Sequence, residues 1–228
     1  MAKPGDDSTD QGSGRCPWAV GHDYIAYHND EWGRAVHGET ALFERFSLEA
    51  FQSGLSWLTI LRKREGFRRA FAGFEADAVA EFDAADVERL LADPGIVRNR
   101  SKILAVIGNA RAVRQLRTSG GLDALVWSFA DATSAVQPPR TPADVPVTTS
   151  AGRALAKALR AAGFGFVGPT TAYAAMQACG LVNDHLQGCP ARAAAGGRGS
   201  SVVADPRGHA VVVRTGDNGR EITREEVD

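Results

Sequence analysis

Two cysteines and two histidines in this chain have the chemistry of metal ligands. His185 and Cys189 lie four residues apart, whereas Cys16 and His28 stand near the opposite end of the sequence. Thiolate sulfur and imidazole nitrogen are the donors that zinc prefers in tetrahedral protein sites. A lone cysteine or histidine is more often a packing residue. If the fold brings all four together, they complete a structural Cys2His2 site that fastens the two ends of the chain.

Glu49 occupies an unusual position in a predicted helix over residues 39–52. Leu42 and Phe46 lie on one apolar stripe of that helix, and Glu49 is the next position on the same stripe. Burying a carboxylate is costly unless a partner compensates. Two interpretations follow from this pattern. Either Glu49 lies at the edge of the stripe with its carboxylate in water, or it is a pocket acceptor for a ligand's N–H groups or positive charge.

Aromatic residues crowd the segment 16–33, which has little helical or strand periodicity. Trp18, Tyr24, Tyr27 and Trp32 all fall within it. Such rings can simply fill a core. They can also form the wall of a pocket, because flat rings stack on flat ligands such as nucleobases.

A glycine-rich turn at residues 163–168 matches the G-x-G-x-x-G pattern of dinucleotide-binding folds. That pattern requires a preceding strand, whereas residues 149–162 are predicted to be helical. The segment is therefore expected to be a helix, a tight turn and a second helix. The amides at the start of the second helix could bind one phosphate, or the turn could be a plain connection between helices.

The remaining periodicity predicts an all-α fold. Residues 1–14 are polar and acidic, and we expect them to be a disordered tail. Residues 190–228 are expected to form a flexible extension with a short hairpin near residues 211–219. Further helices are predicted at 58–71, within 74–91, at 101–117 and at 122–129.

Composition limits the class of protein. The chain has 228 residues, a net charge of −1 and three cysteines. The sparse cysteines and the lack of a signal peptide or a membrane-length apolar run predict a soluble, cytoplasmic protein without membrane contact. Residues 96–117 carry five arginines and one lysine but no acidic residue. This stretch is either a phosphate-binding face or a solvated helix face.

Several uncommon strings then resemble one known family, the DNA-3-methyladenine glycosylase I family of the helix-hairpin-helix superfamily. The resemblance covers about residues 15–189 in register. It is carried by YIAYHNDEWG (24–33), LEAFQSGLSW (48–57), SKILAVIGNARA (101–112), VWSF (126–129) and MQACGLVNDH (176–185).

The resemblance implies a two-lobed helical fold with a DNA-facing cleft. It implies that Glu49 is the pocket glutamate, that Tyr27 and Trp57 sandwich the damaged base, and that Trp18 and Tyr24 line the wall. Leu55, beside Gly54, would fill the gap that the extruded nucleotide leaves. The turn at 163–172, with Gly165, Gly168 and Thr170, would be the hairpin that holds a DNA phosphate. A structural zinc would be bound by Cys16, His28, His185 and Cys189.

The expected activity is hydrolytic release of 3-methyladenine from alkylated double-stranded DNA by a monomer with no nucleotide cofactor. Asp184 is left out of the catalytic set, and Cys179 is expected to be a core residue. Two alternatives stay open at this point. One is a glycosylase for another alkylated base such as 3-methylguanine, and the other is a non-catalytic, zinc-stabilised DNA-binding module.

Overall fold

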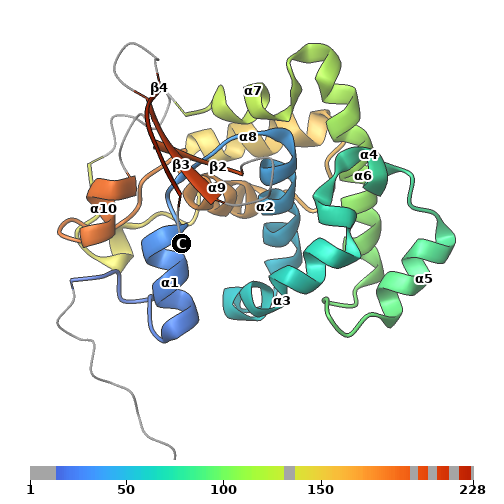
Figure 1. The fold of residues 1–228 in the computed structure, drawn as a ribbon, viewed down its shortest axis with the longest axis horizontal. Helices are drawn as coiled ribbons and strands as arrows, with labels where there is room; N and C mark the ends of the chain where they lie inside the picture. Colours follow the sequence, from blue (N-terminus) through green and yellow to red (C-terminus); the bar gives the residue numbers. More distant parts are fainter. Residues whose placement is uncertain (1–13, 131–136, 196–199, 205–209, 216–220, 227–228) are drawn as a thin grey trace, which may run out of the picture.

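A computed structural model describes residues 14–130 and 137–195, and also the strands at 200–204, 210–215 and 221–226. The described chain is mostly helical (Figure 1), as the periodicity predicts. Nearly all of the tail expected at residues 1–14 lies outside the described residues. Among the described helices, none is both long and apolar enough to cross a bilayer.

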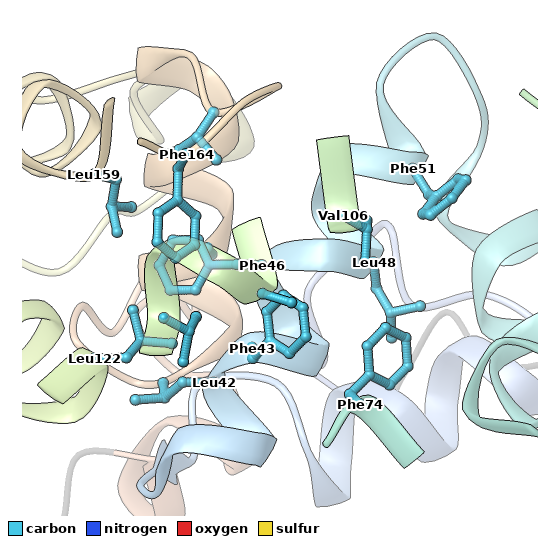
Figure 2. Packing of buried hydrophobic residues seen from close by; sticks show 14 of the residues in the cluster. Leu42, Phe43, Phe46, Leu48, Phe51, Phe74, Val106, Leu122, Leu159 and Phe164 are labelled. Carbon is cyan, nitrogen blue, oxygen red and sulfur yellow. The ribbon is translucent and has the colours of Figure 1, made fainter. Parts of the chain in front are cut away.

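Helix α2 (Glu39–Gln52) lies at the centre of the molecule (Figure 1). Residues 46–51 are all buried, so this helix is enclosed on every side over its second half. Figure 2 shows Leu42 and Phe46 facing the region of Leu122, Leu159 and Phe164, whereas the ring of Phe43 packs against Phe74, 6.0 Å away between centroids. A helix buried all round is the central element of a core rather than a surface helix.

Two groups of helices enclose α2 (Figure 1). The first group is α3 (Trp57–Ala70), α4 (Ala76–Ala80), α5 (Ala84–Ala92) and α6 (Arg100–Leu116). The second is α7 (Gly121–Trp127), α8 (Ser150–Ala161) and α9 (Pro169–Ala178). Short 3-10 turns lie at Ala72–Phe74, Arg117–Ser119 and Pro142–Asp144.

Helix starts follow local capping chemistry. The side chains of Ser56, Asn99 and Thr149 accept hydrogen bonds from the first turns of α3, α6 and α8. The predicted helices at 39–52, 101–117 and 149–162 are confirmed to within a residue at each end. The stretch 74–91 divides in two because Asp83 forms a capping box that starts α5.

The segment 16–33, which showed no clear periodicity, contains helix α1 (His22–Asp30). Tyr27 and His28 are its only buried residues. Because these two are adjacent, they cannot produce the three- and four-residue spacing by which an amphipathic helix is recognised.

The start of the described chain and the segment that ends in helix α10 (Pro190–Ala195) lie together beside α1 (Figure 1). The extension expected at residues 190–228 begins with this helix. Arg34 Nη1 donates a hydrogen bond of 2.9 Å to the carbonyl of Ala194. Arg192 Nη1 donates to the carbonyls of Asn183 and His185 at 2.9 and 2.6 Å. These bonds tie α10 to the rest of the chain.

A four-stranded sheet adds to the helical fold. It contains β1 (Ala35–Val36), β2 (Ser200–Ala204), β3 (Ala210–Thr215) and β4 (Glu221–Glu226) in that order. Strand β1 pairs parallel with β2, and the later pairs are antiparallel. The turn predicted between β3 and β4 lies outside the described residues.

The enclosure of α2 leads to a stability prediction. Leu42 is fully buried, and we expect Leu42→Ala to lower the free energy of unfolding by about 2–5 kcal/mol through lost burial and a cavity. Leu104 is 50% exposed, so Leu104→Ala should change it by less than about 0.5 kcal/mol. Urea denaturation of both variants measures the difference. Equal losses would contradict the central placement of α2.

Candidate functional site

The four candidate metal ligands come together at one buried point. Their ligand atoms all lie within 4.8 Å of one another. His28 Nε2 is 3.2 Å from His185 Nδ1 and 3.4 Å from Cys189 Sγ, and His185 Nδ1 is 3.8 Å from Cys16 Sγ. Tetrahedral zinc with its usual bond lengths places ligand atoms about 3.3–3.8 Å apart, close to these three separations. The set therefore fits a four-coordinate metal with no position left open.

Neighbouring acceptors fix which ring nitrogen faces the cluster. His28 Nδ1 is 2.9 Å from Asn29 Oδ1, and His185 Nε2 is 3.1 Å from the carbonyl of Trp32. Each of these nitrogens thus carries its proton outward and leaves the other one free to bind a metal. Outer hydrogen bonds of this kind orient histidine ligands in metal sites.

Burial sets the protonation of the cluster. It lowers the pKa of His185 to about 4 and raises the pKa of the Cys16 thiol to about 11. At neutral pH the imidazole is therefore neutral, as a ligand must be, and the thiol keeps its proton until a cation displaces it.

Glu49 is the buried acid of the protein's centre. It is 7% exposed, and its carboxylate forms no hydrogen bond within the part of the chain that the structure describes. Burial raises the pKa of Glu49 to about 7, although Arg45 opposes the shift. Of the two interpretations of the sequence, a carboxylate in water is excluded. The group is enclosed and has spare hydrogen-bonding capacity.

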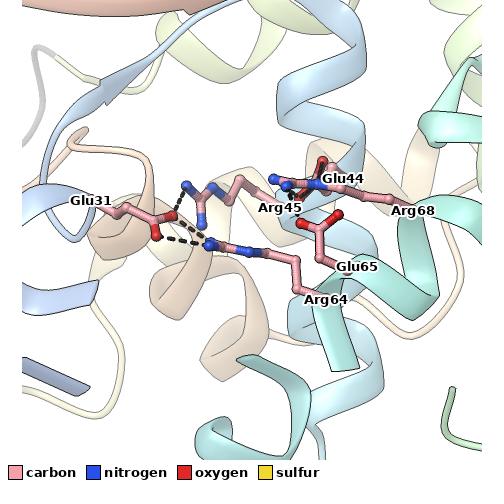
Figure 3. Close-up of polar contacts among 6 residues, drawn as sticks. All are labelled: Glu31, Glu44, Arg45, Arg64, Glu65 and Arg68. Carbon is pink, nitrogen blue, oxygen red and sulfur yellow. Dashed lines mark hydrogen bonds and ion pairs between the residues drawn. The ribbon is translucent and has the colours of Figure 1, made fainter. Parts of the chain in front are cut away.

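An ion-pair network beside Glu49 was not identified from the sequence. Arg45 Nη2 lies 2.8 Å from Glu31 Oε2, and Arg64 holds both oxygens of the same carboxylate (Figure 3). Burial by itself would raise the pKa of Glu31, but the two arginines lower it to about 2. Arg45 Nη1 is buried without a partner among the described residues. The four-residue spacing from Arg45 to Glu49 was the signal available, because it places both on one helix face.

The candidate aromatic residues contact one another, and Glu49 acts electrostatically on one of them, Tyr27. The ring centroids of Tyr27 and Trp57 are 5.3 Å apart, with an angle of 46° between the planes. Trp18 meets Tyr24 edge to face at 5.9 Å and lies 6.4 Å from Tyr27. The indole N–H of Trp57 is buried without a hydrogen-bond partner within the described chain. The rings of Tyr27 and Trp57 thus meet at an angle, and we call this pair the Tyr27–Trp57 corner. The Trp57 N–H is a hydrogen-bond donor that remains available there.

The turn after α2 is short and firmly held. Gly54 has φ +82°, a left-handed conformation that glycine adopts without strain. Leu55 N donates to the carbonyl of Gln52 at 2.7 Å, and Gln52 Nε2 donates back to the carbonyl of Leu55 at 2.9 Å. The side chain of Leu55 is 38% exposed. We call residues 53–56 the wedge turn.

The glycine-rich turn connects two helices, as predicted. Helix α8 precedes it, so the strand that dinucleotide-binding folds require is not present there. Gly168 caps α9, and Pro169 follows at the first helical position. Thr170 lies in the first turn, and Phe166, with φ +53°, is 45% exposed. We call residues 163–168 the hairpin turn.

The arginine-rich stretch is largely ion-paired. Arg114 pairs with Glu81, and Arg117 pairs with Glu39 and Asp77. Arg100 pairs with Glu88. These contacts favour a solvated, ion-paired helix face over a surface reserved for phosphates.

Asp184 is hydrogen-bonded to neighbouring side chains, and Cys179 lies in the core. Asp184 Oδ2 accepts hydrogen bonds from the Tyr173 hydroxyl at 2.5 Å and from Gln177 Nε2 at 2.8 Å. Asp184 and both of these partners line a cavity of about 400 Å³ bordered by Trp18 and Trp32. Cys179 is fully buried, which confirms it as a core residue, and burial raises its pKa to about 12.

Comparison with known proteins adds to this geometry. Residues 18–193 match the family model described as methyladenine glycosylase. The chain is 50% identical over 179 residues to "DNA-3-methyladenine glycosylase 1" of Escherichia coli (strain K12), covering 77% of this chain and 95% of that protein.

Two solved structures extend the match to the fold. A crystal structure of 3-methyladenine DNA glycosylase I has a TM-score of 0.74 and 46% identity, covering 77% of this chain and 98% of that one. The Staphylococcus aureus enzyme, solved to show how it recognises 3-methyladenine, has a TM-score of 0.74 and 32% identity, covering 79% and 97%. The chain belongs to the methyladenine glycosylase family.

Proposed function

We propose that this protein is a monofunctional DNA glycosylase that releases 3-methyladenine from alkylated DNA. The observation that carries the proposal is the buried carboxylate of Glu49, without a hydrogen bond among the described residues and close enough to Tyr27 to act on it electrostatically, while Tyr27 itself meets Trp57. The 50% identity to a curated enzyme of that name supports it. Residues 15–189 form the glycosylase domain in this proposal.

The pocket selects for a positively charged base. Methylation at N3 gives adenine a positive charge within DNA. Ionised Glu49 attracts that charge and accepts hydrogen bonds from the base N–H groups. Tyr27 and Trp57 add a cation–π attraction of roughly 0.5–2 kcal/mol, and Trp18 and Tyr24 complete the wall. Neutral adenine gains neither the attraction to ionised Glu49 nor the cation–π attraction.

The corner must open for a base to stack between its two rings. Face-to-face contact on both sides of a base requires about 7 Å between the ring planes, twice the usual contact distance. The centroids of Tyr27 and Trp57 are only 5.3 Å apart. One ring therefore turns aside when the base enters, and the unpartnered Trp57 N–H then becomes available to it.

The target base must first leave the duplex, which costs a few kcal/mol. Leu55 projects from the wedge turn and fills the gap in the base stack, with Gly54 allowing close approach of the backbone. The hairpin turn, with Gly165, Gly168 and Thr170, binds a phosphate through backbone amides as the hairpin of a helix-hairpin-helix unit. The DNA-facing cleft lies between the two lobes. Double-stranded DNA is the substrate, and the enzyme acts as a monomer.

The chemical step needs little assistance because the cationic base is already a good leaving group. The N-glycosidic bond breaks, and its electron pair neutralises the departing 3-methyladenine. Water adds its oxygen to the sugar carbon and releases one proton. The enzyme's contribution is selection, extrusion and exclusion of bulk water from the pocket.

A structural zinc is the cofactor that we propose for the cysteine–histidine cluster. Cys16, His28, His185 and Cys189 would hold it, and four protein ligands leave no position for water or substrate. The metal would fasten the segment before α1 to the segment before α10. Its role is stability rather than catalysis.

Release of free base from methylated duplex DNA, resolved by chromatography, tests the proposal. We expect 3-methyladenine in the released fraction, while 7-methylguanine stays in the DNA. Release of 3-methylguanine instead would identify a different substrate. Binding of DNA without release of any base would overturn the enzymatic proposal.

Glu49→Gln should weaken free-base binding and slow base release, because the amide keeps the size of the side chain but loses its charge. The pKa of Glu49 is raised to about 7, so the ionised form that binds the cation grows as pH rises. For the unchanged protein, kcat/KM should therefore increase through about pH 7 and then level off. Glu49→Gln should remove this rise. A profile that keeps the same rise in Glu49→Gln would assign it to another group.

Cys189→Ser tests the metal cluster. We expect loss of tightly bound zinc and a lower melting temperature, because removing a structural metal removes folding free energy. Cys179→Ser is the matched control, since Cys179 is also a buried cysteine but does not belong to the cluster, so this variant should keep one zinc per chain. Metal analysis and thermal denaturation give both readouts. Full zinc content and stability in Cys189→Ser would reject Cys189 as a ligand.

A further inference from the structure

One face of helix α6 contacts both the wedge turn and the hairpin turn. Lys102 and Asn109 lie seven residues apart on α6. Seven residues make nearly two turns, so both side chains emerge on the same side, about 10.5 Å apart along the axis. Both are buried although both are polar.

Lys102 holds the end of α2 where the wedge turn begins. Its Nζ donates hydrogen bonds to the carbonyl of Phe51 at 2.8 Å and to the carbonyl of Ser53 at 2.6 Å. The last carbonyls of a helix have no partner within the helix, and α2 has no basic residue in its own last turn. Among the described residues Lys102 forms no ion pair. Its charge is therefore directed at these two carbonyls.

Asn109 holds the hairpin turn in a similar way. Its Oδ1 accepts a hydrogen bond of 2.7 Å from Gly165 N, and its Nδ2 donates to the carbonyl of Gly165 at 3.2 Å. Gly165 packs directly on α6, because a Cβ added there would lie 3.3 Å from the Cβ of Ala105. Ala105 stands between Lys102 and Asn109 on the same face.

Buried polar side chains of this kind are a poor way to stabilise a core. Neighbouring positions on α6, such as Ile103 and Val106, are apolar and fully buried. A lysine and an asparagine cost desolvation that only well-formed hydrogen bonds offset. What they add is a fixed position of each turn relative to α6, because each side chain bonds to one particular stretch of backbone.

We propose that α6 is a rigid spacer that fixes the separation between the wedge turn and the hairpin turn. Lys102 and Asn109 are its positioning residues. A duplex held at a phosphate by one turn then meets Leu55 at a set distance. The inference rests on the proposed function, since it assigns these two turns to DNA. It predicts that the spacer matters for DNA and not for the free base, which needs only the pocket.

Lys102→Met tests the first contact, since methionine is similar in length but cannot donate. We expect affinity for a duplex with an abasic site to fall about tenfold, as for loss of a charged hydrogen bond. Affinity for free 3-methyladenine should change less than about twofold. Lys63→Met is the matched control, because Lys63 is another lysine that donates to a turn carbonyl, that of Pro94 at 2.6 Å. An equal loss of DNA affinity in Lys63→Met would reduce the effect to lost charge and overturn the proposal.

A double-mutant cycle separates positioning from a general loss of structure. If Lys102 acts by holding Leu55, the double variant Lys102→Met with Leu55→Ala should bind abasic DNA no more weakly than the weaker single variant. Additive losses would contradict the proposal. Lys102→Arg keeps a cationic donor, so it should bind abasic DNA more tightly than Lys102→Met. Affinity as low as that of Lys102→Met would also contradict a positioning role.

Asn109→Ser tests the second contact, because serine is too short to reach both atoms of Gly165. We expect affinity for the abasic duplex to fall about threefold to tenfold, as for loss of a hydrogen bond that positions the backbone. Affinity for free 3-methyladenine should change less than about twofold. An unchanged duplex affinity in Asn109→Ser would remove the hairpin turn from the spacer.

The outcome for the unchanged protein separates this inference from the proposed function. If it releases no 3-methyladenine, both fail. If it releases 3-methyladenine and Lys102→Met still binds abasic DNA with full affinity, only the spacer fails.

Discussion

Enclosure of the second half of α2, residues 46–51, is the constraint on which the site depends. A carboxylate on such a helix is largely shielded from water, which is why the pKa of Glu49 is raised to about 7. Arg45, one turn earlier, supplies a compensating positive charge. Its guanidinium is itself paired with Glu31, and Arg64 pairs with the same Glu31 carboxylate. Glu49 is thus left with one partly engaged positive neighbour and without a hydrogen bond among the described residues. A cationic ligand with N–H groups would suit it, because such a ligand brings both a positive charge and hydrogen-bond donors.

The joining of the segment around Cys16 to the segment around Cys189 has a different physical basis. The apolar cluster around Cys16 and Cys189 includes only Ala191 as a further buried residue, with Trp32 and Leu186 packed against it. So small a core cannot offset the conformational entropy of fixing two chain ends. The proposed metal site would supply the missing free energy. Trp18, two residues from Cys16, would then be held beside Tyr27 by the same link.

Much of the fold followed from local sequence signals. Helices at 39–52, 101–117 and 149–162 were predictable because periodicity and capping residues agree there. Helix α1 was not, because two adjacent buried residues give no helical period. The four cysteine and histidine positions were identified by residue type, and the structure brings them within 4.8 Å. The Glu31–Arg45–Arg64 network escaped prediction because its members come from three separate elements.

The sequence alone identified the candidate site residues, the limits of the main helices and the family that the chain resembles. Only the tertiary structure decided that Glu49 is enclosed, that Tyr27 and Trp57 meet at an angle, and that Lys102 and Asn109 bond to two distant turns. The reason is that capping and periodicity depend on residues within a few positions of one another. The burial of a side chain depends on which faces of distant helices come to lie together. So does the pairing of charges in the interior.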